Sequence, residues 1–557
     1  MEYKSSRGQL YNLSVLFFLI IILICTLIAC QPANPDLAVN ARLANLPLRA
    51  GNENTAALVL EVIPKGESPT TIEEIHLVVD GTGAEESIRE IKVFQTPADS
   101  QGKEPIPFGE PAEPRSNIVF SGYLEVKDTT LLMVALSMND NVDLSGKIWI
   151  SINKLVTTSG TVKVANSDAE DFLRFGIALR RHNDDGVHTY RIPGLTTTNN
   201  GTLLAVYDAR RESARDMQGH MDIGLSRSTD GGISWEPMQV VLDMGTWGGL
   251  PEKFNGVSDA CILVDQNTND IYVAGLWMHG VINSDGVWVE GLTENSTEWN
   301  HQWRDKGSQP GFDVRQTSQF LITKSGDDGT SWSDPVNITR MGKKEEWWLW
   351  APAPGHGITL DDGTLVFPTQ GRDHTGMSFS NITYSKDGGK TWSSTEPACL
   401  NSTECMAVQL TDGSIMLNMR HNENRNNLTA NNGRAVAVTR DLGKTWTDHP
   451  TSRNTLIEPT CMASIHKHNY SVDGEKKSIL LFSNPESRTQ RENMTIKVSF
   501  DDGLTWPEEN KVLLDAGRGR GYSCLTSIDE NTIGILYESS QADLVFQRIP
   551  LKDLLGK

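Results

Sequence analysis

The sequence is short of basic residues. Its 557 residues hold 50 Lys and Arg against 71 Asp and Glu, which gives a formal net charge of −21. This balance argues against nucleic-acid binding and against electrostatic docking on anionic lipid, because both need a basic surface. An anionic substrate would have to be bound by local arginines that overcome the repulsion of the whole molecule.

Cysteine is also scarce, and its spacing is uninformative. Seven are present, and five lie beyond the N-terminal segment, at positions 261, 399, 405, 461 and 524. This odd number and irregular spacing indicate neither a disulfide framework nor a metal site, although Cys399 and Cys405 are close enough in sequence to pair. The twelve His show no metal-ligand spacing. We therefore expect stability from packing, and no metal or cofactor.

Long apolar runs are missing except near the N-terminus. Lys4 and Arg7 precede an apolar run from Val15 to Ile28, which ends at Ala29-Cys30. A basic start, a short apolar core and small residues at a cleavage point are typical of an export signal over residues 1–30. The Leu-Ile-Ala-Cys quartet resembles the lipobox of bacterial lipoproteins, so Cys30 is the predicted lipidation site. The alternative is an uncleaved transmembrane anchor. Either way, we expect an exported, membrane-anchored protein in the periplasm or on the cell surface.

The length predicts at least two domains. In residues 31–170, short β-rich segments such as 57–62, 75–79 and 131–136 are separated by turn residues, and helical periodicity is scarce. The pattern predicts a small β-sandwich. It is either a carbohydrate-binding or spacer module or a packing domain.

Residues 171–557 contain a repeated motif, Ser/Thr-x-Asp-x-Gly-x-Ser/Thr-Trp. Its five copies end at Trp235, Trp332, Trp392, Trp446 and Trp506, so the last four lie 54 to 60 residues apart. In each copy the Asp accepts backbone N–H groups, the Gly supplies positive φ, and the Trp packs beside a hairpin. A repeat of this length suits one four-stranded blade of a β-propeller. The longer first interval predicts an inserted loop between Trp277 and Phe312.

Tyr190-Arg191-Ile192-Pro193 stands before the first box. Together with the repeated boxes, it resembles the Phe/Tyr-Arg-Ile-Pro motif of the sialidases (neuraminidases). The resemblance covers roughly residues 172–550. It implies a six-bladed β-propeller that removes terminal sialic acid from glycoproteins, glycolipids such as gangliosides, and oligosaccharides.

The resemblance assigns three arginines to the carboxylate of sialic acid. They are Arg191, Arg420 and Arg491, with Arg488 as the alternative to Arg491. Guanidinium suits this role because it is planar, always charged and bidentate.

The family replaces the usual carboxylate nucleophile by a Tyr, because a neutral phenol avoids repulsion by the substrate carboxylate. Tyr522 matches the nucleophile and Glu404 its base, 16 residues before the second arginine. Asp216 matches the general acid/base, and Asp208 is the weaker candidate.

Three further residues have supporting roles by resemblance. Glu538 matches the carboxylate that orients Arg191, and Arg210 and Asp259 match contacts to the O4 region of the sugar. The Trp347-Trp348-Leu349-Trp350 run forms either an apolar pocket for the N-acetyl group or a core strand of a blade.

The implied reaction retains configuration in two steps, through a covalent sialyl-tyrosine. Two alternatives use the same scaffold: a trans-sialidase, intermolecular or intramolecular, and a non-catalytic sialic-acid-binding propeller. A cluster of arginines argues against a hydrolase of neutral sugars. Linkage preference and oligomeric state are not readable from the sequence.

Overall fold

The computed structural model describes most of the chain beyond the N-terminal segment, namely residues 36–66, 68–96, 104–166, 171–217, 219–249, 252–280, 289, 301 and 308–556. The predicted export signal, with Cys30, lies outside the described residues, as does most of the predicted insertion between Trp277 and Phe312. Within the described ranges, no helix has the length and apolar character needed to cross a membrane.

The chain divides into two compact units. One contains the residues up to Ala44, Glu53–Ser137 and Ile148–Phe172; the other contains Asn45–Asn52, Met138–Lys147 and Leu173–Lys557. The main boundary thus follows residue 172. Two short segments expected in the N-terminal domain belong to the second unit, because β2 (Leu48–Arg49) pairs with β12 (Leu173–Arg180) and the Lys147 ammonium lies 2.6 Å from the Asp553 carboxylate.

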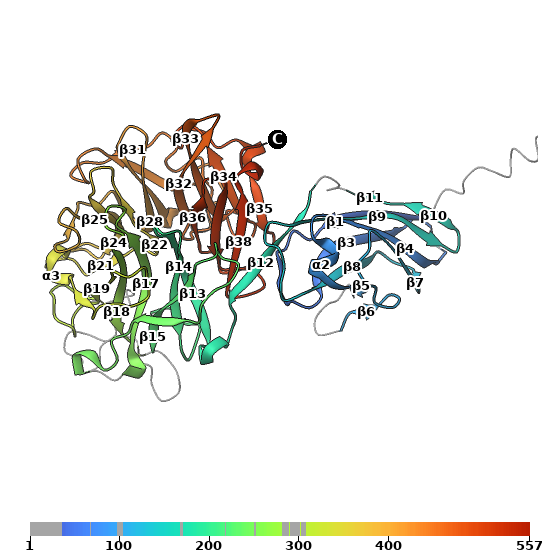
Figure 1. The fold of residues 1–557 in the computed structure, drawn as a ribbon, viewed down its shortest axis with the longest axis horizontal. Coiled ribbons are helices and arrows are strands. Elements are labelled where there is room, and N and C mark those ends of the chain that lie inside the picture. The colour runs from blue at the N-terminus through green and yellow to red at the C-terminus, as the bar shows by residue number, and fades with distance from the viewer. Residues whose placement is uncertain are drawn as a thin grey trace, which may run out of the picture. The chain divides into compact units, whose positions relative to one another are not determined.

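The described residues of the first unit form strands and one short helix, α2 (Ala84–Ser87) (Figure 1). One sheet has the order β11 (Ala165–Asn166), β1 (Leu37–Leu43), β3 (Thr55–Pro64), β8 (Thr130–Met138), β5 (Ile88–Thr96) and β6 (Ile106–Pro107). The other contains β10 (Gly160–Lys163), β9 (Lys147–Thr157), β4 (Thr70–Asp80) and β7 (Asn117–Val126). Alternate residues of β1, β4 and β7 are buried, as expected when one face of each sheet packs on a core. The all-β expectation for this unit is confirmed.

The second unit, here called the propeller unit, consists of antiparallel sheets that follow one another along the chain (Figure 1). Its described strands form six consecutive groups. The first three are β13 (Thr189–Thr197), β14 (Leu203–Arg210), β15 (Met221–Ser228) and β16 (Gln239–Leu242); β17 (Asn255–Val264), β18 (Ile271–His279), β19 (Gln319–Ser325) and β20 (Val336–Asn337); and β21 (Leu349–Pro352), β24 (Leu365–Arg372), β25 (Ser378–Ser385) and β26 (Ser393–Ser394). Short strands β22 (Gly355–His356), β23 (Ile358–Thr359) and β27 (Cys399–Leu400) and helix α3 (Thr339–Gly342) flank them.

The remaining groups are β28 (Ser402–Gln409), β29 (Ile415–His421), β30 (Ala435–Thr439) and β31 (Thr447–Asp448); β32 (Ser464–Val472), β33 (Glu475–Pro485), β34 (Met494–Ser499) and β35 (Val512–Asp515); and β36 (Ser523–Asp529), β37 (Thr532–Tyr537), β38 (Leu544–Pro550) and β12. Strand β12, which precedes the first group in the sequence, therefore completes the last group. This pairing joins the beginning of the propeller chain to its end.

The five repeated boxes are the turns between the third and fourth strands of their groups. In the second box, the Asp327 carboxylate accepts the Ser331 N–H at 2.8 Å and the Ser325 hydroxyl at 2.8 Å. The hydrogen bonds from Ser331 lower the pKa of Asp327 to about 2. Each box is thus a turn stabilised by its own side chains, as the repeat predicted.

Apolar cores lie between neighbouring sheets. One joins β14 and β15 to β17 and β18, and another joins β28 and β29 to β32 and β33. Trp347 and Trp350 pack in such a core, against Phe379 and Phe320, with ring centroids 4.8 and 4.5 Å apart. Trp347 and Trp350 are therefore core residues, whereas Trp348 is only partly buried and donates to the His374 carbonyl at 3.3 Å. All five described cysteines are free thiols, so Cys399 and Cys405 form no disulfide.

Candidate active site

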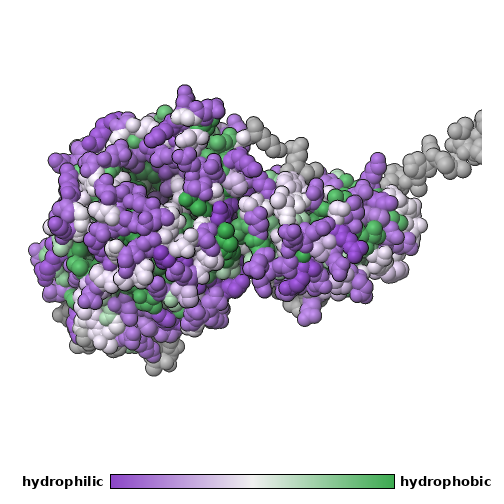
Figure 2. Space-filling model, in the orientation of Figure 1, coloured by the Kyte–Doolittle hydropathy of each residue, from purple (hydrophilic) through white to green (hydrophobic). Residues whose placement is uncertain are grey.

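Side chains from all six groups line a cavity of about 450 Å³. The first five groups contribute residues from their strands and connecting loops, and the last group contributes Tyr522, directly before β36. Five arginines and three carboxylates line it: Arg191, Arg372, Arg420, Arg425 and Arg491, with Asp216, Asp259 and Glu404. The face of the molecule shown in Figure 2 is mostly hydrophilic. The local excess of guanidinium groups in this cavity can attract an anion, even though the negative net charge of the whole molecule repels it.

Three inner strands carry a register shift at a site residue. β13 is irregular between Arg191 and Gly194, β17 between Ser258 and Cys261, and β28 between Ser402 and Cys405. In the first two the backbone enters the left-handed region, with φ of 60° at Ile192 and 58° at Asp259. A bulge redirects a side chain that regular pleating would aim into a sheet–sheet core, and it costs some strain.

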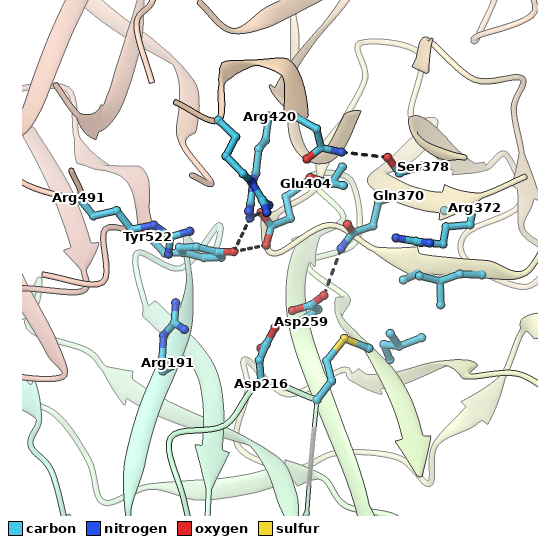
Figure 3. Close-up of a pocket in the computed structure, with 18 residues that line it drawn as sticks. Arg191, Asp216, Asp259, Gln370, Arg372, Ser378, Glu404, Arg420, Arg491 and Tyr522 are labelled. Carbon is cyan, nitrogen blue, oxygen red and sulfur yellow. Dashed lines mark hydrogen bonds and ion pairs between the residues drawn. The ribbon is translucent and has the colours of Figure 1, made fainter. Parts of the chain in front are cut away.

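Tyr522 and Glu404 form the centre of the site (Figure 3). The Tyr522 hydroxyl donates a short hydrogen bond to Glu404 Oε1, while Arg420 Nη1 contacts Glu404 Oε2 and lies 3.1 Å from the same hydroxyl. The Arg420 Nε atom is buried and has no hydrogen-bond partner among the described residues, so this guanidinium keeps a donor for a ligand. The arrangement is a phenol paired with a carboxylate base under a fixed positive charge.

Burial raises the pKa of Tyr522 well above its ordinary value, and the neighbouring Glu404 raises it further, against the opposing charges of Arg420 and Arg491. The phenol is therefore neutral in the free protein. It can become a nucleophile only if its proton passes to a base in contact with it, and Glu404 is the carboxylate in contact.

Glu538 connects Arg191 to the backbone of Tyr522. Its carboxylate accepts Arg191 Nε at 2.7 Å, Arg191 Nη2 at 3.1 Å, the Ile192 N–H at 3.0 Å and the Tyr522 N–H at 3.0 Å. The side chain is only 1% exposed. Burial alone would raise the pKa of Glu538, but the charge of Arg191 and these hydrogen bonds lower it. The carboxylate thus stays ionised and holds both groups in place.

Arg491, rather than Arg488, lines the cavity. Its guanidinium donates to the Arg520 and Thr460 carbonyl oxygens at 2.9 and 3.3 Å, and lies 5.5 Å from the centre of the Tyr522 ring. The Arg191 guanidinium lies 5.1 Å from that centre. Together with Arg420, three guanidinium groups therefore lie around one tyrosine.

Asp216 lies on the loop between β14 and β15, across the cavity from Glu404 (Figure 3). Its side chain is 55% exposed, and Oδ1 accepts Arg210 Nη2 at 2.7 Å. Partial burial tends to raise the pKa of Asp216, but the charges of Arg210 and Arg191 outweigh it and lower the pKa. The adjacent Met217 is buried and anchors this part of the loop.

Asp208 and Arg210 lie behind the cavity wall. Neither lines the cavity, and both are almost completely buried. Asp208 accepts Arg210 Nη2 at 2.9 Å, the Ser258 hydroxyl at 2.7 Å and the Asp259 N–H at 3.1 Å. With its oxygens engaged in this way, Asp208 is placed to support Arg210 and Asp259 and not to protonate a leaving group. Of the two candidate acids, Asp216 alone faces the cavity.

Asp259 faces Asp216 and is held by a residue that the sequence analysis missed. Gln370 Nε2 donates to Asp259 Oδ2 at 3.1 Å and to the Pro352 carbonyl at 3.3 Å. Burial, and then repulsion from Asp216, raises the pKa of Asp259 well above its ordinary value. A neutral carboxyl at this position can donate as well as accept a hydrogen bond.

One side of the cavity is apolar. Met217, Leu276, Leu349 and Ala351 line it and belong to one buried cluster. Leu349 is thus the residue of the 347–350 run that reaches the cavity. Polar residues that the sequence analysis did not identify line the cavity as well: Gln370, Arg372, Ser378, Thr403, Asn422 and Arg425. No motif marks them, because each is brought to the cavity only by the packing of its sheet.

Comparisons with known proteins show which family this chain resembles. A family model described as a BNR repeat-like domain matches residues 192–511. A sialidase of Bacteroides fragilis (strain YCH46) is 44% identical over 424 residues, covering 76% of this chain and 73% of that protein. A sialidase of Micromonospora viridifaciens is 32% identical over 64% of this chain and 50% of its own length. The solved structure of Hadza microbial sialidase Hz136 has a TM-score of 0.80 and 35% identity, and the match covers 92% of this chain and all of that one.

Proposed function

The chain belongs to the sialidase family with BNR repeat-like domains, and from that premise we propose that it is an exo-α-sialidase that releases terminal sialic acid with retention of configuration. The observation that carries the proposal is the contact of Tyr522 with Glu404 and Arg420, inside a cavity that three arginines make cationic. The substrates are sialylated glycoproteins, glycolipids and oligosaccharides.

Arg191, Arg420 and Arg491 bind the carboxylate on the anomeric carbon. Two features favour this role: all three guanidinium groups lie around the Tyr522 ring, and the Arg420 Nε atom has no hydrogen-bond partner among the described residues. The apolar side of the cavity is suited to the methyl part of an N-acyl group. Asp259, with its raised pKa, can bind a sugar hydroxyl as donor or acceptor.

Tyr522 attacks the anomeric carbon while its proton passes to Glu404. The developing phenolate is stabilised by Arg420, whose Nη1 already lies 3.1 Å from the oxygen. Water then attacks the anomeric carbon from the face opposite Tyr522, which the leaving group has vacated, and gives a proton to Asp216; the sialyl-tyrosine bond breaks and the proton on Glu404 returns to Tyr522. Two inversions give overall retention.

Asp216 protonates the leaving oxygen and then activates water. In the free enzyme its pKa is lowered by Arg210 and Arg191. A substrate carboxylate bound to the arginines neutralises part of that positive charge, so substrate binding raises the pKa of Asp216 toward the value that a general acid needs. The acid is thereby activated only when the sugar is in place.

The test is hydrolysis of 4-methylumbelliferyl α-sialoside by wild type, Tyr522→Phe and Tyr384→Phe. Tyr384 lies on β25, outside the cavity, and serves as the matched control. Wild type and Tyr384→Phe should release the fluorophore, and Tyr522→Phe should lose kcat by orders of magnitude with KM changed only a few-fold. A Tyr522→Phe enzyme of near-normal kcat would exclude the proposed nucleophile.

Product analysis separates hydrolysis from its alternatives. NMR of the first product should show α-sialic acid before mutarotation. An anhydro sugar would instead indicate intramolecular transfer, and a new sialoside formed with added lactose would indicate transfer to an acceptor. Binding of sialic acid without any turnover would mean that the propeller is a lectin.

For localisation we propose an exported protein held at the membrane by lipid on Cys30. The proposal rests on the order of features in the N-terminal segment: basic residues come first, an apolar run follows, and Ala29-Cys30 ends it.

A further inference from the structure

A second polar cluster lies at the foot of the loop that carries Asp216. His220 ends this loop, Asp222 lies on β15, and Asp243 follows β16. One ligand atom from each of the three lies within 4.8 Å of the others. None of the three lines the catalytic cavity.

The two inner members of the cluster are incompletely satisfied. Arg211 Nε holds Asp222 Oδ2 at 2.9 Å, but Asp222 Oδ1 and His220 Nε2 are buried without a hydrogen-bond partner among the described residues. The Asp222 side chain is only 2% exposed. Buried polar atoms are nearly always satisfied, so a pair of such atoms facing one site calls for a ligand between them.

The spacing of these atoms is longer than a direct hydrogen bond and matches that of two ligands on one metal ion. His220 Nε2 lies 3.4 Å from Asp222 Oδ1 and 3.6 Å from Oε1 of Glu252, in the short 3-10 helix Glu252–Phe254. A direct N–H···O bond would be about 2.7–3.2 Å. Ligands bound at about 2.0–2.1 Å in a tetrahedron lie roughly 3.3–3.4 Å apart. Asp243 completes the set on the solvent side, and its Oδ1 also accepts the Gly245 N–H at 2.8 Å.

We propose that His220, Asp222 and Asp243 bind a divalent cation of the Zn²⁺ class, with Glu252 as a further carboxylate beside His220. One imidazole with carboxylates suits a borderline transition metal, since soft thiolate ligands are absent from the set and a purely hard site would not use His. Arg211 donates a hydrogen bond to Asp222 Oδ2, which orients the carboxylate and leaves Oδ1 to bind the metal. The exposed Asp243 and the half-exposed Glu252 give the ion a route from solvent.

The consequence for the enzyme is control of the loop that holds the general acid. The loop is closed at its foot by the Arg211 N–H, which donates to the His220 carbonyl at 3.1 Å. The cation would join this foot to the segments after β16 and before β17, three parts of the chain that are separate in sequence. The loop, and Asp216 with it, would then be less mobile. This consequence rests on the proposed function, whereas the binding of the ion does not.

The first experiment measures binding directly. Metal-free protein, prepared with a chelator and dialysed, is titrated calorimetrically with Zn²⁺ at pH 7.5, beside His220→Ala, Asp222→Asn and His182→Ala. His182 is exposed and lies outside the cluster, so it is the matched control. Wild type and His182→Ala should bind one equivalent at micromolar protein and gain thermal stability. His220→Ala and Asp222→Asn should lose that equivalent while keeping the circular dichroism of wild type.

Two outcomes would overturn the site. Wild type that binds no Zn²⁺ would mean that the cluster is an ion-pair network with a protonated His220, whose pKa is raised by Asp222. Binding that survives unchanged in both His220→Ala and Asp222→Asn would place the metal elsewhere.

A second experiment tests the link to catalysis. Chelated wild type should hydrolyse a natural sialoglycan several-fold more slowly than Zn²⁺-loaded enzyme, with kcat affected more than KM. The Asp216→Ala variant should bind Zn²⁺ normally but lose this sensitivity. Zn²⁺ binding by a chain without sialidase activity would leave the metal site standing and reject the proposed function. A kcat independent of Zn²⁺ in a metal-binding wild type would reject the control of the loop.

Discussion

Glu538→Gln is the substitution that tests most directly how the site is held together. The change keeps the size of the side chain but replaces one carboxylate oxygen by an NH₂ group. Both oxygens of Glu538 accept from two donors: Oε1 from Arg191 Nε and the Ile192 N–H, and Oε2 from Arg191 Nη2 and the Tyr522 N–H. In either orientation of the Gln amide, its NH₂ group faces two of these four N–H donors. Two of the four hydrogen bonds are therefore replaced by contacts between two donors.

The size of the effect follows from the burial of Glu538, which is 1% exposed. Removing one partner of a buried ion pair costs about 3–5 kcal/mol. Because 1.36 kcal/mol corresponds to a factor of ten, a loss of about 3 kcal/mol in transition-state stabilisation would lower kcat/KM roughly 100-fold. Most of it should appear in kcat, since Tyr522 loses its backbone anchor while Arg191 remains able to bind the substrate carboxylate.

The assay combines steady-state kinetics on an α-sialoside with thermal unfolding, and Glu396→Gln is the control. Glu396 is 61% exposed and pairs with Lys344, which is 39% exposed, so its loss should cost little. The lowered pKa of Glu538 means that its stabilisation is complete above the unfolded value, about 4.3, and is lost as the pH falls through the folded value. The melting-temperature difference from wild type should therefore shrink below pH 4. An active Glu538→Gln enzyme within three-fold of wild type would refute the positioning role.

Three further predictions concern other parts of the chain. Asp216→Ala should lower kcat/KM on a natural sialoglycan by about 10²–10⁴-fold, and much less on 4-methylumbelliferyl α-sialoside, whose leaving group needs little protonation; equal losses on both would contradict a general acid. Asp327→Asn should lower the melting temperature by a few degrees at pH 7 with KM unchanged, and because the pKa of Asp327 is about 2 the difference should vanish as the pH approaches 2; an altered KM would argue against a structural box. Cys30→Ser protein should leave the membrane fraction on cell fractionation, whereas retention there would argue for a transmembrane anchor.

The amino-acid sequence by itself determined the features that are encoded locally. The five boxes are turns whose Asp, Gly and Ser or Thr contact one another within eight residues, so each can be read without knowledge of the rest of the chain. Arg191, Glu404, Arg420 and Tyr522 were found because they stand in recognisable motifs in the family's order. The structure brings these four residues together in one cavity.

Tertiary structure alone decided which residues meet at the axis of the sheets. Gln370 reaches Asp259 from another sheet, and Arg491 rather than Arg488 faces the cavity. Short-range patterns do not encode such contacts, because they depend on where a strand bulges and how neighbouring sheets pack. The same holds for the Trp347–Trp350 run: whether a Trp lines a core or a cavity depends on which face the neighbouring sheet covers, and the chain sequence of one strand does not contain that information.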